Sequence, residues 1–245
     1  MKIIAHRGAS FYAPENTMSA FKLAMEYGVD GIEMDVHVTK DGKIVVIHDD
    51  TTGRTGTRNI KIKNSNLKTL DKVDVGNWFD AKYMGERIPH LEDVLEKIPS
   101  NFELYIEIKS NIKSVDNFVN FFTKYKEIHD RIVIIGFDYN VVKRLKLLLP
   151  NFTILWIVEY GYNVPKNKDM YSNVYKMILN AKLDGISTYA DLTHCIKMAK
   201  EIKNHNWIWN VWTVDNPHLA KQLMNLGVTT LTTNRPDWIM KHLFA

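Results

Sequence analysis

Eight short apolar segments, each followed by an amphipathic stretch, constrain the fold of this chain more than any other feature of its sequence. The apolar segments predict buried strands over residues 2–6, 31–36, 104–108, 132–136, 153–157, 184–187, 207–212 and 228–232. The stretches between them predict helices over residues 17–27, 91–98, 115–128, 141–149, 170–180, 192–203, 217–226 and 236–244. A strand followed by a helix, repeated eight times, is typical of a (β/α)₈ barrel, the TIM-barrel fold.

The main alternative is an open, doubly wound sheet. That fold usually has fewer strands and carries a glycine-rich turn after the first one. Here the first strand is followed by His6-Arg7-Gly8-Ala9-Ser10, which lacks the G-x-G-x-x-G pattern. The 245 residues also match the roughly 250 residues of a typical barrel, so we expect one catalytic domain over residues 1–245.

One segment interrupts this rhythm after the second strand. Asp41-Gly42 is a strong hairpin signal, and residues 44–47 predict a return strand. We expect this hairpin to rise above the barrel and not to add a ninth barrel strand. About 40 residues follow before the next helix, and loops of this length usually serve a function. We treat residues 49–90 as an insertion whose Trp78, Phe79 and Tyr83 pack over another part of the protein.

Charge and composition exclude several other classes of protein. The formal net charge is +4 and the lysines are scattered, which argues against a nucleic-acid partner. Cys195 is the only cysteine, so no disulfide can form within the chain. No signal peptide and no apolar run of membrane-spanning length are found. We therefore expect a cytoplasmic protein without stable membrane insertion.

Two carboxylates lie on the same face of the predicted strand 31–36. Glu33 and Asp35 are two residues apart, so both point to one side, and Ile32 and Met34 point to the other. The apolar side chains must face the helices, which directs the carboxylates into the barrel. The alternative is an edge strand with solvated acids.

The strand 104–108 repeats this arrangement. Glu107 and Lys109 share one face, and Ile106 and Ile108 share the other. Three carboxylates at one barrel mouth favour a hard divalent cation with oxygen ligands, Mg²⁺ or Ca²⁺. The alternative is a buried salt bridge between Lys109 and one of the acids.

Two histidines, His6 and His48, end apolar strands near the same mouth. A histidine pair can supply a general base and a general acid at neutral pH, although a strand-end histidine is often structural. The remaining histidines fall in helices, turns or outward positions and are interpreted as surface residues: His37, His90, His129, His194, His205, His218 and His242.

Two cations and an aromatic side chain complete the candidate site. Arg7 and Lys109 can bind a phosphate, one through a bidentate fork and the other as a point charge. Trp212, at the end of the seventh strand, either packs against a substrate or caps the barrel. Together these residues suit metal-assisted hydrolysis of a phosphate ester.

Several short motifs occur in order along nearly the whole chain. They are His6-Arg7-Gly8, Pro14-Glu15-Asn16-Thr17, Glu33-Met34-Asp35-Val36, Asp41-Gly42, His48-Asp49, Ile88-Pro89, Leu91-Glu92-Asp93-Val94-Leu95, Glu107-Ile108-Lys109, Val211-Trp212-Thr213-Val214 and Thr233-Asn234-Arg235-Pro236. His-Arg-Gly alone is a weak signal, but the ordered set is specific. The set resembles the glycerophosphodiester phosphodiesterase family.

The resemblance implies a TIM barrel with a small insertion after the second strand. It implies a small-molecule glycerophosphodiester as substrate, cleaved to sn-glycerol 3-phosphate and an alcohol such as choline or ethanolamine. The implied roles are acid/base catalysis by His6 and His48, binding of one divalent cation, Mg²⁺ or Ca²⁺, by Glu33, Asp35 and Glu107, phosphate binding by Arg7 and Lys109, and contact of Trp212 with the glycerol. The nucleophile is either water or the glycerol 2-hydroxyl.

Two other functions compete with this one. A phospholipase on the same barrel, directed at phosphoinositides or sphingomyelin, would have an exposed apolar rim or a secretion signal. A binding protein with an inactive site would lack one of the histidines or carboxylates, and none is missing.

Overall fold

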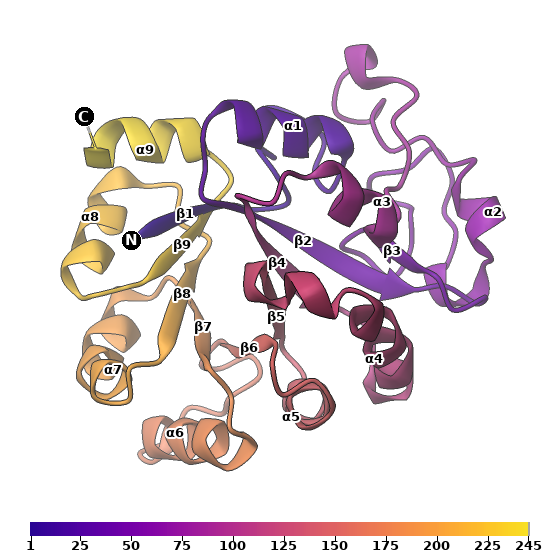
Figure 1. Ribbon diagram of the computed structural model, residues 1–245. Coiled ribbons are helices and arrows are strands. Elements are labelled where there is room, and N and C mark those ends of the chain that lie inside the picture. Colours follow the sequence, from indigo (N-terminus) through magenta and orange to yellow (C-terminus); the bar gives the residue numbers. More distant parts are fainter. Residues whose placement is uncertain (245) are drawn as a thin grey trace.

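The computed structural model describes residues 1–244, and eight parallel strands close into a barrel within it (Figure 1). The barrel strands are β1 (Lys2–Ala5), β2 (Gly31–Val38), β4 (Glu103–Ile108), β5 (Ile132–Gly136), β6 (Thr153–Val158), β7 (Gly185–Tyr189), β8 (Ile208–Trp212) and β9 (Thr230–Thr233). Strand β1 pairs with both β9 and β2, which closes the sheet on itself. The predicted TIM barrel is therefore confirmed, and the open doubly wound sheet is excluded.

Helices surround the barrel (Figure 1). They are α1 (Met18–Glu26), α3 (Leu91–Lys97), α4 (Val115–Lys124), α5 (Tyr139–Leu148), α6 (Met170–Ala181), α7 (Leu192–Asn204), α8 (Pro217–Asn225) and α9 (Pro236–Phe244). The caps explain where two of them begin. The Thr17 side chain accepts a hydrogen bond from the Ala20 amide, and Asn216 caps α8 just before Pro217.

One predicted helix is too long. The interval 115–128 was expected to be a single helix, but α4 ends at Lys124 and a 3₁₀ segment, Lys126–Arg131, follows. The chain has to reverse before β5 begins at Ile132, and tighter 3₁₀ turns accomplish this in few residues.

The segment after β2 forms a separate layer beside the barrel (Figure 1). Strand β3 (Ile44–Val46) pairs antiparallel with β2 and with no other barrel strand, so the predicted return strand is confirmed and is no ninth barrel strand. The short helix α2 (Leu67–Leu70) and two 3₁₀ turns, Ile62–Asn64 and Ala81–Tyr83, follow. The segment has its own apolar cluster, formed by Val45, Ile47, Ile62, Leu70, Val73, Val75 and Ile88.

The three aromatic residues of the insertion pack edge-to-face in a row. The ring centroids of Trp78 and Phe79 lie 5.6 Å apart, and those of Phe79 and Tyr83 lie 5.8 Å apart. The Tyr83 hydroxyl donates to the carbonyl oxygen of Tyr12 at 3.0 Å. The row thus attaches the insertion to the loop between β1 and α1.

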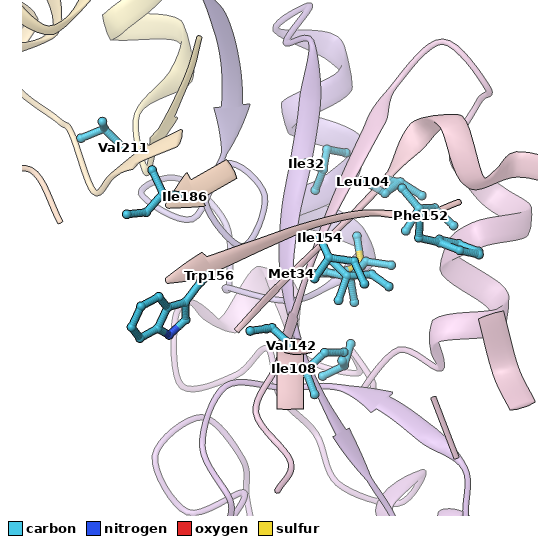
Figure 2. Close-up of a cluster of buried hydrophobic side chains, with 14 of the residues drawn as sticks. Ile32, Met34, Leu104, Ile108, Val142, Phe152, Ile154, Trp156, Ile186 and Val211 are labelled. Atoms are coloured by element: carbon cyan, nitrogen blue, oxygen red, sulfur yellow. The ribbon is translucent and has the colours of Figure 1, made fainter. Parts of the chain in front are cut away.

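Two apolar layers hold the barrel together. The larger one lies between strands and helices and includes Met34, Ile154 and Val142 (Figure 2). The smaller one fills the barrel interior with Ile4, Tyr105, Val133, Ile135, Leu155 and Ile157. Within residues 1–244, no helix is both long and apolar enough to cross a bilayer.

Candidate active site

Three buried carboxylates converge inside the barrel at the carboxyl ends of β2 and β4. The register pairs Asp35 directly with Glu107, and Glu33 lies on the same face two residues before Asp35. Glu33 is 2% exposed and Asp35 is 0% exposed, which rules out an edge strand with solvated acids. One potential ligand atom from each carboxylate lies within 4.8 Å of the others.

The two predicted cations lie against these carboxylates. Arg7 Nε is 3.0 Å from Asp35 Oδ2, and Lys109 Nζ is 2.6 Å from Glu107 Oε1 and 3.3 Å from Asp35 Oδ1. The salt bridge considered as an alternative for Lys109 therefore exists in this structure. It does not replace the carboxylate cluster, because three acids face two positively charged side chains, Arg7 and Lys109.

Burial and neighbouring charges shift the pKa values of the three acids in different directions. Although burial acts to raise it, the pKa of Asp35 is held well below its usual range by Arg7 and Lys109. Burial and the charge on Asp35 raise the pKa of Glu107 to about 7. Burial, Asp35 and Glu107 likewise raise the pKa of Glu33. A further positive charge would relieve this like-charge repulsion.

The carboxylate cluster fits a hard divalent cation. Glu33 Oε1 is buried without a hydrogen-bond partner, and the buried oxygens Asp35 Oδ1 and Glu107 Oε1 face a single shared cation, Lys109. Buried carboxylate oxygens of this kind are costly unless a cation or a donor satisfies them. Oxygen donors are also the ligands that Mg²⁺ and Ca²⁺ prefer.

His6 follows β1 and is oriented by a neutral amide. Its Nδ1 is 2.7 Å from Asn234 Oδ1, and Asn234 is held in turn by two hydrogen bonds to Asp215, from its backbone and from its side-chain amide. Burial, followed by the nearby Arg7, lowers the pKa of His6 to about 4. The Nε2 atom lies 3.9 Å from Glu33 Oε2.

His48 follows β3 and is oriented by a carboxylate. Its Nδ1 is 2.6 Å from Asp49 Oδ1. Its backbone carbonyl oxygen accepts a hydrogen bond from His37 Nε2 at 2.9 Å. The prediction that His37 is a surface residue is wrong, because its side chain is buried beneath His48. Alternation could have identified it, since residues 33, 35 and 37 share one strand face.

A second histidine was also misassigned to the surface. His194 on α7 lies 2.6 Å from the Tyr171 hydroxyl of α6, and its side chain is 16% exposed. Burial lowers its pKa. It belongs to the packing between two helices and is remote in sequence from the candidate site.

The sequence interpretation gave no role to several residues that hold the site together. Asn16 donates to Asp35 Oδ2 at 2.8 Å and accepts from the Asp35 amide at 3.2 Å. Asn234 and Asp215 support His6, as described above. Asn16 and Asn234 stand in motifs noted in the sequence, but only their tertiary contacts reveal what they support.

A cavity of about 570 Å³ opens over these groups. Of the predicted site residues, His6, Arg7, Glu33, His48, Glu107, Lys109 and Trp212 line it, and Asp35 lies buried behind them. The ring centroid of Trp212 is 5.5 Å from that of Phe137, which is 5.5 Å from that of Tyr162. One side of the cavity is therefore charged and the other is aromatic.

Known proteins resemble this chain over almost its full length. A model of the glycerophosphoryl diester phosphodiesterase family matches residues 6–238. A glycerophosphodiester phosphodiesterase from Caldanaerobacter subterraneus subsp. tengcongensis is 33% identical, with 97% of this chain and 96% of that protein covered. One from Bacillus subtilis is 30% identical, with 97% of this chain and 85% of that protein covered.

Solved structures share the fold. An Oleispira antarctica phosphodiesterase, in complex with the product sn-glycerol-3-phosphate, has a TM-score of 0.86 at 24% identity, covering 100% of this chain and 97% of that one. A glycerophosphodiester phosphodiesterase from Agrobacterium tumefaciens has a TM-score of 0.83 at 23% identity, covering 98% and 99%. At these identities, the likeness demonstrates a common barrel fold.

Proposed function

This chain belongs to the glycerophosphoryl diester phosphodiesterase family, and on that premise we propose that it hydrolyses glycerophosphodiesters to sn-glycerol 3-phosphate and an alcohol. One observation carries the proposal. Two histidines with different hydrogen-bond partners line the same cavity as the carboxylate cluster and two cations. A binding protein with an inactive site would not need this complete set.

Two sources of positive charge would face the substrate phosphate: a metal ion held by the carboxylates, and two basic side chains. Glu33, Asp35 and Glu107 would hold one divalent cation, Mg²⁺ or Ca²⁺, which when bound neutralises charge on the phosphoryl oxygens. Arg7 and Lys109 would bind the phosphate from the protein side. Since both cations pair with carboxylates in this structure, we expect them to turn partly toward the phosphate when substrate enters.

The hydrogen-bond partners suggest how the two histidines share the proton transfers. A neutral amide at Nδ1 leaves His6 Nε2 free to accept a proton, so we assign it as the general base. The Asp49 carboxylate stabilises a protonated imidazole, so we assign His48 as the general acid. His6 takes the proton of the nucleophile as the nucleophile's oxygen forms a bond to phosphorus. His48 gives a proton to the departing alkoxide as the other P–O bond breaks.

The nucleophile is water or the glycerol 2-hydroxyl. Attack by the 2-hydroxyl passes through a cyclic phosphate and gains from intramolecular proximity. A substrate analogue without that hydroxyl should then react slowly. Equal rates on the intact and the 2-deoxy substrate would favour water.

The test is a product assay with purified protein. Glycerophosphocholine and glycerophosphoethanolamine are incubated with Mg²⁺, Ca²⁺ or EDTA, and sn-glycerol 3-phosphate is measured. His6→Ala and His48→Ala should each lose about 10²- to 10⁴-fold in kcat. His218→Ala is the matched control, since His218 is exposed on α8. Absence of product with either cation would refute the proposed function.

A further inference from the structure

Arg54, in the insertion, connects the loop after β1, which carries His6 and Arg7, with the segment after β3, which carries His48. Its Nη1 and Nη2 donate to the two carboxylate oxygens of Glu15, both at 2.8 Å. Its Nε and Nη2 donate to the two oxygens of Asp49, at 2.8 and 3.1 Å. One guanidinium therefore makes two bidentate contacts, the geometry for which arginine is suited and lysine is not.

Both carboxylates held by Arg54 have a second partner inside the site. Asp49 Oδ1 faces His48 Nδ1 at 2.6 Å, and Glu15 Oε1 accepts from Arg7 Nη1 at 2.9 Å. The result is a chain of alternating charge from His48 through Asp49, Arg54 and Glu15 to Arg7. Arg54 itself is not among the residues that line the cavity.

The two ends of this chain depend on Arg54 to different degrees. Arg7 is also held by Asp35, at 3.0 Å, and by a hydrogen bond from its own backbone amide to Glu33. Within residues 1–244, His48 and Arg54 are the side chains that form hydrogen bonds or ion pairs with the Asp49 carboxylate. Removal of Arg54 would leave Asp49 near the charge of Glu15 with no cation between them.

We infer that Arg54 is a positioning residue: it holds the Asp49 carboxylate against Nδ1 of His48, and so keeps Nε2 as the nitrogen that His48 presents to the cavity. The inference rests on the proposed function, in which His48 protonates the leaving alkoxide. It also gives the insertion a role, because a residue outside the barrel controls the orientation of a residue at its mouth.

A merely structural role is a weaker explanation of the same contacts. The Arg54 side chain is 44% exposed, and exposed ion pairs contribute little to folding stability. Removal of Arg54 should therefore change the stability of the fold much less than it changes the orientation of His48.

The leaving group distinguishes the two explanations. A choline alkoxide must be protonated as it departs, whereas p-nitrophenolate departs without a proton. Arg54→Ala should lower kcat for glycerophosphocholine by about 10- to 100-fold, the loss that follows when the hydrogen-bond partner of a metal-ligating histidine is removed. With glycerophospho-p-nitrophenol its kcat should stay within about threefold of the wild-type value, because general acid catalysis contributes little there. His48→Ala should show the same pattern.

Two further variants control the experiment. Arg58→Ala removes an exposed arginine from the same insertion and should leave both rates unchanged. Arg54→Lys keeps the charge but cannot make the two bidentate contacts. Its rate on glycerophosphocholine should therefore fall between those of the wild type and Arg54→Ala. An equal loss of rate on both substrates, or no loss on either, would overturn the inference.

A second measurement does not depend on turnover. In ¹⁵N-histidine-labelled protein, the Nδ1 proton of His48 should give a downfield signal, assigned by its absence in His48→Gln. The signal should persist in Arg58→Ala and disappear in Arg54→Ala. Persistence of the signal in Arg54→Ala would overturn the inference. Failure of the protein to cleave any glycerophosphodiester would refute only the proposed function, because the signal can be measured without turnover.

Discussion

At the scale of single residues, the same side-chain type behaves differently according to its partners. Asp35 is kept charged by Arg7 and Lys109, whereas the pKa of Glu107 rises to about 7. His6 faces an amide and His48 faces a carboxylate. The carboxylate cluster thus combines repulsion between acids with a demand for positive charge.

This balance leads to a prediction for Glu33→Gln. In EDTA the variant should be at least as stable as the wild type, because one buried negative charge is removed. At about 100 times the Kd of Mg²⁺ or Ca²⁺, the wild type should gain about 2.7 kcal/mol. For a chain of this length that corresponds to an increase of roughly 5 to 10 °C in Tm. The Glu33→Gln variant should gain much less stability from the same cation. Thermal unfolding with each cation and with EDTA measures both effects, and an equal gain in both proteins would contradict the assignment of Glu33 as a ligand.

At the scale of elements, two polar interactions connect neighbouring segments of the outer layer. Arg131, just before β5, donates to the carbonyl oxygens of Leu95, Ile98 and Pro99 at the end of α3. His194 joins α7 to Tyr171 of α6.

Arg131→Ala should destabilise the fold while sparing catalysis. The substitution leaves three carbonyl oxygens without their charged donor, and such a loss costs about 3 kcal/mol. Arg144→Ala, an exposed arginine of α5, is the control and should cost less than about 0.5 kcal/mol. Urea unfolding gives both values. A reduced kcat in folded Arg131→Ala would show that this end of the barrel affects the site, which we do not expect.

His194 should make stability dependent on pH. Burial lowers its pKa in the folded state, so the folded protein binds this proton less readily than the unfolded chain. The stability that depends on neutral His194 is complete above the unfolded pKa, about 6.5, and is lost as the pH falls from there toward the folded pKa. The free energy of unfolding should thus fall less steeply below pH 6.5 in His194→Gln than in the wild type. Parallel curves in urea titrations at several pH values would refute this prediction.

At the scale of the whole molecule, the protein has more than one apolar core. The barrel cores and the cluster of the insertion are separate groups of buried side chains. His48, Asp49 and Arg54 lie at or within the insertion, whereas the carboxylate cluster lies in the barrel. The proposed active site therefore depends on how firmly one unit is attached to the other.

Leu70→Ala tests whether the two units open independently. Leu70 is fully buried in the cluster of the insertion, and its truncation should cost about 3 kcal/mol. Hydrogen exchange should show lower protection in residues 47–88 and unchanged protection in β4 and β5. Leu145→Ala, in the barrel's outer core, is the matched control and should lower protection of the barrel. A uniform loss of protection in Leu70→Ala would mean that insertion and barrel unfold as one unit.

Much of the fold and part of the site could be predicted without the structure. Strand and helix positions follow from contacts between residues two, three or four apart, which periodicity records. The same alternation directed Glu33, Asp35 and Glu107 into the barrel. It applies to His37 as well, which the sequence interpretation nevertheless assigned to the surface. The burial of His37 depends on the strand that returns from Gly42.

The sequence by itself determined which side chains face the barrel interior and in which order the motifs reach its mouth, because these depend on local backbone geometry. Only the tertiary structure decided which groups touch: Asn234 against His6 across 228 positions, and Arg54 between Glu15 and Asp49. Such contacts depend on where closure of the barrel and packing of the insertion bring distant loops together. No periodicity in the sequence records that, so Asn234 and Arg54 could be identified as supports of the two histidines only in the folded protein.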